Sequence, residues 1–303
     1  MKIIDAHVHL LERIAGYGRR GALRPVSEGK AEWENGDIVE ILNPDYGGCD
    51  FRAEKVIQLM DKNNVEKAVI MQGPIYGFQN EYAHESMLQF PGRFAAFCGI
   101  DPYCFGALDI LKHYIEDYHF TGLKLEMSFS NGFSGFHPEF SLNSEIMDKF
   151  WKYAMECCFP VCLDMGPYGF HSYQPENVVL IAKKYPEIPI VIEHCFFPGR
   201  NEDNVLENSL QMISEFSNIN VTLAALPALS APELYPFPSV CRYMLMMKKY
   251  LGTERIIWGT DIPSVLVKNN YSQLINFVAD SQCFAADELR KIMYENAARI
   301  YAL

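Results

Sequence analysis

The chain has 303 residues, of which 49% are hydrophobic and 13% aromatic, so it can bury a large core and is not a disordered protein. Its formal net charge is −12 and no basic run interrupts it, which argues against binding to nucleic acid or to an anionic membrane surface. Nine cysteines without a C-x-x-C pair, and a first strand that is not preceded by a signal-peptide pattern, predict a cytoplasmic protein with reduced thiols.

Short apolar runs alternate along the chain with longer amphipathic stretches, a pattern typical of strand and helix units around a parallel sheet. We predict eight strands, at Lys2–Ala6, Lys67–Gln72, Phe94–Ile100, Gly122–Glu126, Pro160–Asp164, Ile188–Glu193, Asn220–Ala224 and Arg255–Gly259. Predicted helices between them include Glu54–Asn63, Ala107–Tyr118, Ser144–Glu156, Pro175–Lys184, Asn204–Glu215 and Val240–Tyr250. Eight units favour one α/β domain over residues 1–303, a closed (β/α)8 TIM barrel. No G-x-G-x-x-G directly follows the first predicted strand, and G-x-x-x-x-G-K-[ST] does not occur, so nucleotide binding has no support.

Two connections are unusually long, and both follow strands that should end at the barrel mouth. Residues 11 to 50 contain Arg19, Arg20 and Arg24, and we expect a lid, a binding loop or a disordered flap at the pocket entrance. The second connection, Ser128–Phe140, is rich in Ser, Gly and Phe.

The first strand ends in Asp5-Ala6-His7-Val8-His9. Residues two apart in a strand point the same way, so His7 and His9 can present two imidazoles to one metal ion. The alternative is a pair of surface histidines beyond the strand. A position at the C-terminal end of the opening barrel strand favours the ligand interpretation, because active sites of these barrels lie at that face.

Ionisable residues also follow the sixth and eighth predicted strands. Asp261 comes directly after Trp258-Gly259-Thr260, where it can bind a metal and accept a proton from water, although an aspartate before a proline can also be a turn residue. His194 follows a buried run and is a candidate ligand or general acid or base, with a hydrogen-bonded core histidine as the alternative.

These motifs together resemble the amidohydrolase superfamily, in the branch that contains the aminocarboxymuconate-semialdehyde decarboxylase-like enzymes. The resemblance covers nearly the whole chain. It rests on Asp5-Ala6-His7-Val8-His9, Asn80-Glu81, Pro91-Gly92-Arg93-Phe94, Asp101-Pro102, Gly122-Leu123-Lys124-Leu125, Glu193-His194, Trp258-Gly259-Thr260-Asp261 and Glu295-Asn296-Ala297-Ala298-Arg299-Ile300-Tyr301.

The resemblance implies that His7, His9 and Asp261 bind one divalent metal ion, zinc with manganese or magnesium as alternatives, while His194 assists the chemistry. The family usually has a histidine on the fifth strand, and this chain has Asp164 there. Three interpretations stay open: Asp164 is itself a ligand, Glu126 replaces it, or the metal is weakly bound or absent.

Lys124 resembles the lysine that is carboxylated in binuclear relatives, and the alternative is an internal ion pair between Lys124 and Glu126.

The expected activity is that of a metal-dependent hydrolase acting through activated water on a small, carboxylated or cyclic substrate. Non-oxidative decarboxylation, hydration or lactone opening are alternatives within the family, and a non-catalytic metabolite-binding barrel is the alternative outside enzymes. Assembly into a homo-oligomer is left open. The candidate substrate-binding residues are Arg19, Arg20, Gln72, Tyr76, Asn80, Lys124, His171 and Tyr173.

Overall fold

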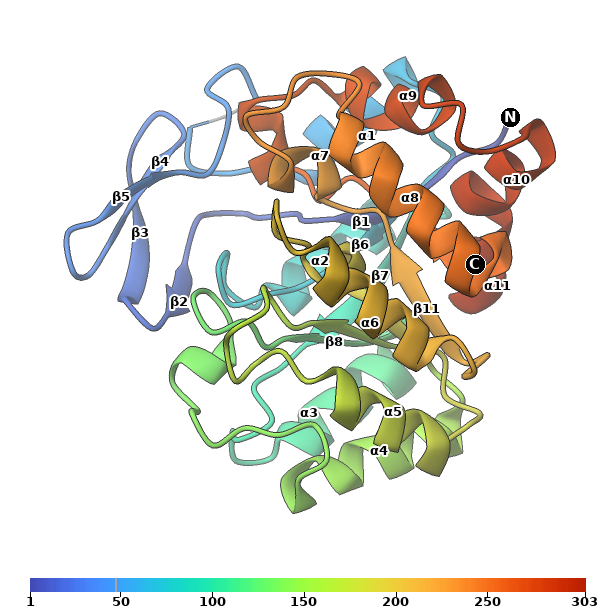
Figure 1. Ribbon diagram of the computed structural model, residues 1–303. Coiled ribbons are helices and arrows are strands. Elements are labelled where there is room, and N and C mark those ends of the chain that lie inside the picture. The colour runs from blue at the N-terminus through green and yellow to red at the C-terminus, as the bar shows by residue number, and fades with distance from the viewer. Residues whose placement is uncertain (47) are drawn as a thin grey trace.

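The computed structural model describes residues 1–46 and 48–303, and its central feature is an eight-stranded parallel sheet rolled into a barrel (Figure 1). The strands follow one another around the barrel in chain order, as a (β/α)8 fold requires, so the predicted TIM barrel is confirmed. They are β1 (Ile4–Val8), β6 (Lys67–Ile70), β7 (Phe94–Gly99), β8 (Gly122–Glu126), β9 (Val161–Asp164), β10 (Ile190–Ile192), β11 (Ile219–Thr222) and β12 (Ile256–Ile257).

The barrel closes between its last and first strands through separate backbone contacts. The amide of Ala6 donates to the carbonyl of Trp258 at 3.3 Å, and the amide of Asp261 donates to the carbonyl of His7 at 2.8 Å. A Cβ on Gly259 would lie 2.9 Å from the backbone nitrogen of His7, so only glycine permits this approach. Because β12 and β1 are joined only by these separate contacts, β12 has two residues, whereas the predicted strand was Arg255–Gly259. The same contacts bring Asp261 beside β1.

The first strand also differs from its predicted bounds, and the difference affects the site. It runs two residues further than expected because the amide of Met71 donates to the carbonyl of Val8 at 2.8 Å, which continues the pairing with β6. His7 therefore lies within the strand, and His9 follows it directly.

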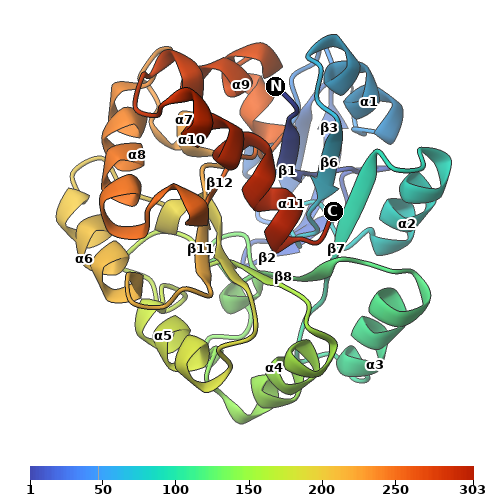
Figure 2. The same ribbon diagram turned by 90° about the vertical axis from the view of Figure 1, so that its right-hand side faces the viewer.

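Helices surround the barrel, and the last one lies across its N-terminal end (Figure 2). Tyr301, just after that helix, packs edge-on against Phe97 of β7 with ring centroids 5.0 Å apart, and both are fully buried. The helices are α1 (Ala53–Lys62), α2 (Asn80–Gln89), α3 (Ala107–Lys112), α4 (Glu145–Cys157), α5 (Pro175–Lys184), α6 (Asp203–Ile213), α7 (Leu226–Leu229), α8 (Pro238–Leu251), α9 (Tyr271–Asp280), α10 (Ala286–Arg290) and α11 (Asn296–Ile300). No helix among the described residues has the length and apolar character needed to cross a membrane.

The long connection after β1 forms regular structure, which corrects our expectation of a loop or flap. It folds into an antiparallel sheet of β2 (Gly16–Gly18), β3 (Gly21–Ser27), β4 (Lys30–Trp33) and β5 (Ile38–Glu40), which projects from the barrel (Figure 1). Side chains of β4 alternate between exposed and buried, and Trp33 is 1% exposed. Strands of three to seven residues carry too short an alternation to stand out within a polar segment.

Candidate active site

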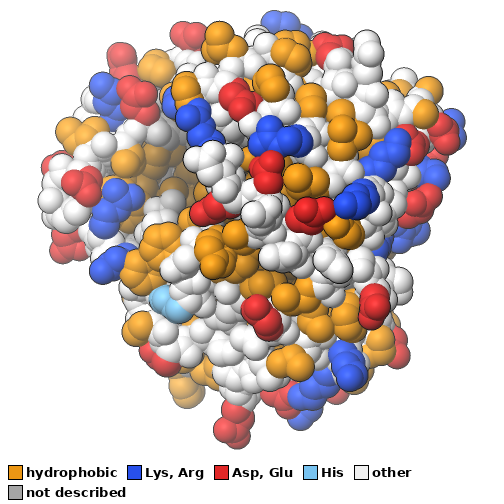
Figure 3. All heavy atoms as spheres, viewed as in Figure 1, with side chains coloured by type: hydrophobic (Ala, Val, Ile, Leu, Met, Phe, Trp, Pro, Cys, Tyr) orange, Lys and Arg blue, Asp and Glu red, His pale blue; other side chains and the backbone are white. Residues whose placement is uncertain are grey.

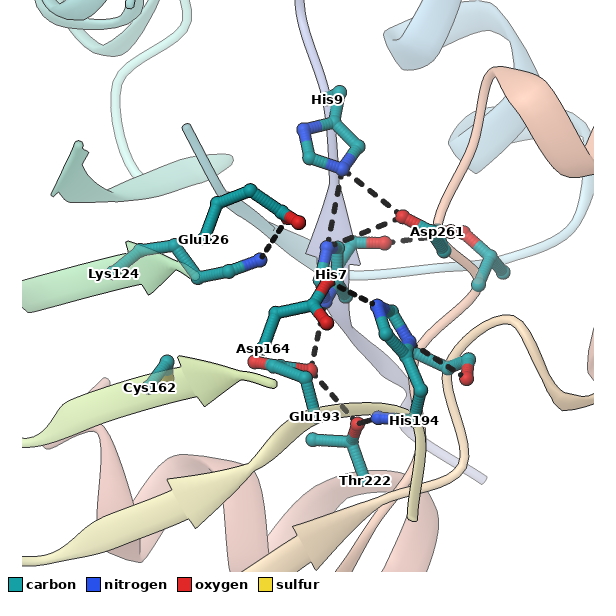
Figure 4. A network of polar contacts seen from close by, with 12 residues as sticks. His7, His9, Lys124, Glu126, Cys162, Asp164, Glu193, His194, Thr222 and Asp261 are labelled. Atoms are coloured by element: carbon teal, nitrogen blue, oxygen red, sulfur yellow. Dashed lines mark hydrogen bonds and ion pairs between the residues drawn. The ribbon is translucent and has the colours of Figure 1, made fainter. Parts of the chain in front are cut away.

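Three potential ligand atoms converge at the C-terminal end of the barrel (Figure 4). Nε2 of His7 lies 3.2 Å from Nε2 of His9, and Oδ1 of Asp261 lies 3.3 Å from the first and 3.0 Å from the second. The alternation of the strand and the close approach of Asp261 to β1 produce this triangle. Zinc bonds of 2.0–2.1 Å in a tetrahedral site require ligand atoms about 3.3 Å apart. The geometry and the donor types therefore fit a divalent ion such as zinc.

His7 is held in the form that a metal ligand needs. Its Nδ1 donates to Oε2 of Glu193 at 2.9 Å, and the hydroxyl of Thr222 donates to the same oxygen at 2.8 Å. Burial lowers the pKa of His7 to about 4, so the ring is neutral at pH 7 and its Nε2 lone pair is free. Such a carboxylate behind a metal-binding histidine fixes its tautomer and orientation.

Asp261 is ionised and held in an unusual backbone conformation. Its φ of 70° is left-handed, which is costly for a residue other than glycine and is found where surrounding contacts enforce it. Burial would raise the pKa of Asp261, but the hydrogen bond with His9 and the charges of nearby histidines lower it to about 2. A carboxylate in this state can bind a metal or accept a proton.

Asp5 ties the strands that carry these residues together. Its Oδ1 accepts from the amides of Thr260 at 2.9 Å and His7 at 3.3 Å, and its Oδ2 accepts from the hydroxyls of Thr260 at 2.7 Å and Tyr271 at 2.8 Å. Four donors on one fully buried carboxylate hold β1 and the segment after β12 in register.

His194 also lies close to His7, and the centroids of the two imidazole rings are 5.2 Å apart. Its Nδ1 lies 3.0 Å from the carbonyl of Ala224 and its Nε2 lies 3.1 Å from Oδ2 of Asp164. A carbonyl and a carboxylate can only accept, so both ring nitrogens donate and the imidazole is charged. Burial would lower the pKa of His194, but the charge and hydrogen bond of Asp164 raise it to about 10.

The backbone around His194 is left-handed for four successive residues, with φ values of 55°, 48°, 64° and 56° from His194 to Phe197. This turn follows β10 directly and directs the imidazole across the barrel mouth. One ligand atom each of His7, His194 and Asp261 lie within 4.8 Å of one another, so His194 lies within reach of the metal position.

Two further predicted residues, Lys124 and Glu126, form a buried pair on β8. Nζ of Lys124 lies 3.7 Å from Oε2 of Glu126 and has no hydrogen-bond partner among the described residues, and the hydroxyl of Ser128 donates to Oε1 of Glu126 at 2.7 Å. Burial and the charge of Asp164 raise the pKa of Glu126 to about 8. Burial would lower the pKa of Lys124, but the surrounding carboxylates raise it above its usual value.

These groups open into a cavity of about 390 Å³ at the C-terminal face. Its lining includes His9, Glu126, Asp164, His194 and Asp261, together with residues from the connections. Glu40 of β5 also lines it, so the projecting sheet forms part of the entrance, where the surface is hollowed (Figure 3). A cavity of this size suits a small molecule.

Of the predicted substrate-binding residues, Tyr76 lies at the cavity, with its ring centroid 4.8 Å from that of His9. Arg19 stacks on Phe129 and Arg20 on Trp33, each at 4.4 Å from the ring centroid, and neither lines the cavity.

The other predicted substrate-binding residues have structural partners. Gln72 accepts from the amide of Gln79, Asn80 bonds the backbone of Gly99 in both directions, and Tyr173 shares a hydrogen bond with Ser209. His171 packs edge-on against Phe129, at 5.2 Å between ring centroids. None of these four, nor Lys124, is among the described residues that line the cavity.

The sequence interpretation did not assign roles to Glu193, Thr222 or Asp5. Glu193 and Asp5 are buried carboxylates close to predicted site residues. Both lie in predicted barrel strands, and the sequence could have indicated their roles because a carboxylate in a buried strand needs partners. Thr222 carried no such signal, because threonine is common in strands.

Comparisons with known proteins agree with this picture. The amidohydrolase family model matches residues 4–303, whereas none of the curated proteins matches the chain. A solved structure of a probable 2-pyrone-4,6-dicarboxylic acid hydrolase from Acinetobacter baumannii, with citric acid bound, is similar with a TM-score of 0.70, 16% identity and full coverage of both chains.

Two further solved structures are similar. A Burkholderia multivorans amidohydrolase with bound zinc has a TM-score of 0.73, 14% identity and full coverage of both chains. A 2,6-dihydroxybenzoate decarboxylase from Rhizobium has a TM-score of 0.57 and 17% identity, over 82% of this chain and 87% of that one. These likenesses show the shared fold. Because the family model extends over nearly the whole chain, this protein belongs to the amidohydrolase family of metal-dependent enzymes.

Proposed function

We propose that this enzyme hydrolyses a carbonyl compound of small size, using one divalent metal ion, zinc, held by His7, His9 and Asp261. The observation that carries the proposal is the triangle of ligand atoms at 3.0 to 3.3 Å, with the far nitrogen of His7 bound to Glu193. Zinc is favoured over manganese and magnesium because two of the three donors are imidazoles, and a zinc-bound amidohydrolase shares the fold.

An ion at this position would supply a polarised carbonyl oxygen and a water of lowered pKa. Asp261 has the position and the charge to take a proton from the attacking water at a carboxylate oxygen. His194 holds a proton on Nε2, shared with Asp164, and lies where it can stabilise the developing oxyanion or protonate the leaving group. In this proposal Asp164 orients His194 instead of binding the metal, and Glu126 lies beside Lys124 without binding the metal.

Non-oxidative decarboxylation is the second candidate, and one observation favours it. His194 donates from both ring nitrogens, so it is a charged acid at the cavity wall that can protonate a carbon as carbon dioxide leaves.

The test of the proposal combines metal analysis with a substrate screen. The purified protein is stripped with a chelator, reloaded separately with zinc, manganese and magnesium, and assayed on lactones, amides and aromatic carboxylic acids. We expect about one ion per chain and metal-dependent hydrolysis, with zinc restoring the most activity. Release of carbon dioxide without hydrolysis would establish the second candidate. Equal hydrolysis by the stripped and reloaded protein would refute the metal-dependent proposal.

A cytoplasmic location also remains our proposal. It is supported by nine cysteines that are all unpaired, as expected in a reducing compartment.

A further inference from the structure

The two walls of the cavity differ in chemistry. One wall comes from the ends of β8 and β9 and presents Glu126, Ser128 and Asp164. Another comes from α7 and the turn after Asp261, and presents Ala228, Leu229, Val265 and Val267. A ligand between them meets oxygen atoms on one edge and hydrocarbon on the other.

Two side chains of the polar wall, Ser128 and Asp164, can only accept hydrogen bonds from a ligand. Ser128 donates its only hydroxyl proton to Glu126 at 2.7 Å, so its oxygen can only accept from a ligand. Asp164 accepts from His194 at 3.1 Å and from the amide of Gly166 at 3.1 Å, and a carboxylate oxygen retains further lone pairs. Ser128 and Asp164 therefore offer acceptors, for which a ligand must bring the donors.

The charges of the polar wall are balanced as well. Asp164 pairs with His194 at 3.1 Å, and Glu126, whose raised pKa of about 8 keeps it mostly uncharged at neutral pH, adds little negative charge. An ammonium group on the ligand is therefore not required for neutrality. Neutral donors such as hydroxyl groups match the unfilled acceptors without adding charge.

Cations that could hold a carboxylate are scarce. Of the described lysines and arginines, Lys268 alone lines the cavity, and it is exposed at the rim. Four carboxyl groups share that lining: Glu40, Glu126, Asp164 and Asp261. The buried imidazolium of His194 also lines the cavity, but Asp164 already pairs with it at 3.1 Å. Apart from the proposed metal ion, a substrate with several carboxylates would therefore meet these groups without an unpaired buried cation.

We propose that the β8–β9 wall is a subsite for neutral hydrogen-bond donors, and that the substrate is an uncharged ring with hydroxyl groups on one edge and an apolar opposite edge. The inference that the substrate has a reacting carbonyl rests on the proposed hydrolysis, whereas the inference of the subsite rests only on the residues of the β8–β9 wall. Binding and turnover can therefore be tested separately.

The experiment measures binding of four δ-lactams to the zinc-loaded enzyme by calorimetry, because lactams resemble cyclic esters and resist hydrolysis. The probes are piperidin-2-one, its 3,4-dihydroxy form, its 3-amino form and 6-oxopiperidine-2-carboxylate. We expect the dihydroxy form to bind about tenfold more tightly than the unsubstituted ring, since each added hydrogen bond contributes several-fold in affinity. The carboxylate should bind more weakly than either. Tightest binding of the amino or carboxylate form, or equal binding of the dihydroxy and unsubstituted rings, would overturn the subsite.

A pair of variants locates the effect. Ser128→Ala should reduce the preference for the dihydroxy ring by about fivefold or more, and Ser141→Ala, the same change outside the cavity lining, should leave it intact. An unchanged preference in Ser128→Ala would place the recognition elsewhere and contradict the assignment. If the dihydroxy lactam binds as expected but the matching hydroxylated lactone is not hydrolysed, the proposed reaction fails and the subsite stands.

Discussion

The two ends of the barrel use the same eight strands for opposite purposes. Towards the N-terminal end the interior is filled by apolar side chains such as Val69, Phe97 and Val191, and Tyr301 covers them. Towards the C-terminal end the strands present histidines and carboxylates around one cavity. The difference indicates that the first end determines stability and the second determines chemistry, as in other barrels of this kind. Substitutions at one end should therefore leave the property of the other unchanged.

The largest effect is expected for Asp261→Asn. Loss of the carboxylate removes both a ligand and the proton acceptor, so kcat should fall by about a thousandfold or more. The thermal midpoint of unfolding should change little. A kcat within tenfold of the wild type would show that Asp261 is not the proton acceptor.

Tyr301→Ala tests the opposite end. Removing this fully buried ring should lower the free energy of unfolding by about 3 to 5 kcal/mol, because a cavity forms beneath α11. Zinc content, measured on the folded protein, should stay at that of the wild type. Tyr301→Phe keeps the packing and is the matched control, and zinc loss in Tyr301→Ala alone would mean that the two ends are coupled.

Asp164→Asn has a smaller, more diagnostic effect. If Asp164 acts by orienting His194, kcat should fall by about ten- to a hundredfold, while KM and the dissociation constant for zinc stay within about threefold. The rate and the metal affinity are measured on the same preparation. A loss of zinc affinity that parallels the loss of rate would instead make Asp164 a ligand.

The smallest effect on stability is expected for a substitution of Asp148, which lies on α4 outside the barrel, and this effect should depend on pH. Hydrogen bonds from Lys152, Lys184 and Tyr185 hold the pKa of Asp148 well below its usual value. A lowered folded-state pKa stabilises the fold above about pH 4, and this contribution is lost as the pH falls towards the folded-state value. Asp148→Asn should lower stability by less than about 1 kcal/mol at pH 7, because both lysine partners are exposed to solvent and Asp148 is only partly buried. The difference between the two proteins should shrink at pH 3, and a difference that grows there would contradict this.

Much of the fold was predictable because the barrel strands are continuous apolar runs with a clear period. Gly122–Glu126 has its predicted bounds, and the strand-end rule brought His7, His9, His194 and Asp261 to one place. The contact between Asp164 and His194 was not predictable, because it depends on the left-handed turn after β10. The positions of Arg19 and Arg20 were not predictable either, because they depend on how the projecting sheet packs. Arg19 stacks on Phe129, which is distant in sequence, and Arg20 stacks on Trp33, which lies in a strand that was not predicted.

The metal content of the His7→Ala/His9→Ala double variant tests the central claim most directly. The wild type and the variant are loaded with zinc under the same conditions, desalted and measured by elemental analysis, with circular dichroism to verify folding. Because the two imidazoles supply two of the three proposed donors, we predict that bound zinc falls from about one ion per chain to below about one tenth. Equal zinc content in the two folded proteins would contradict the assignment of the site.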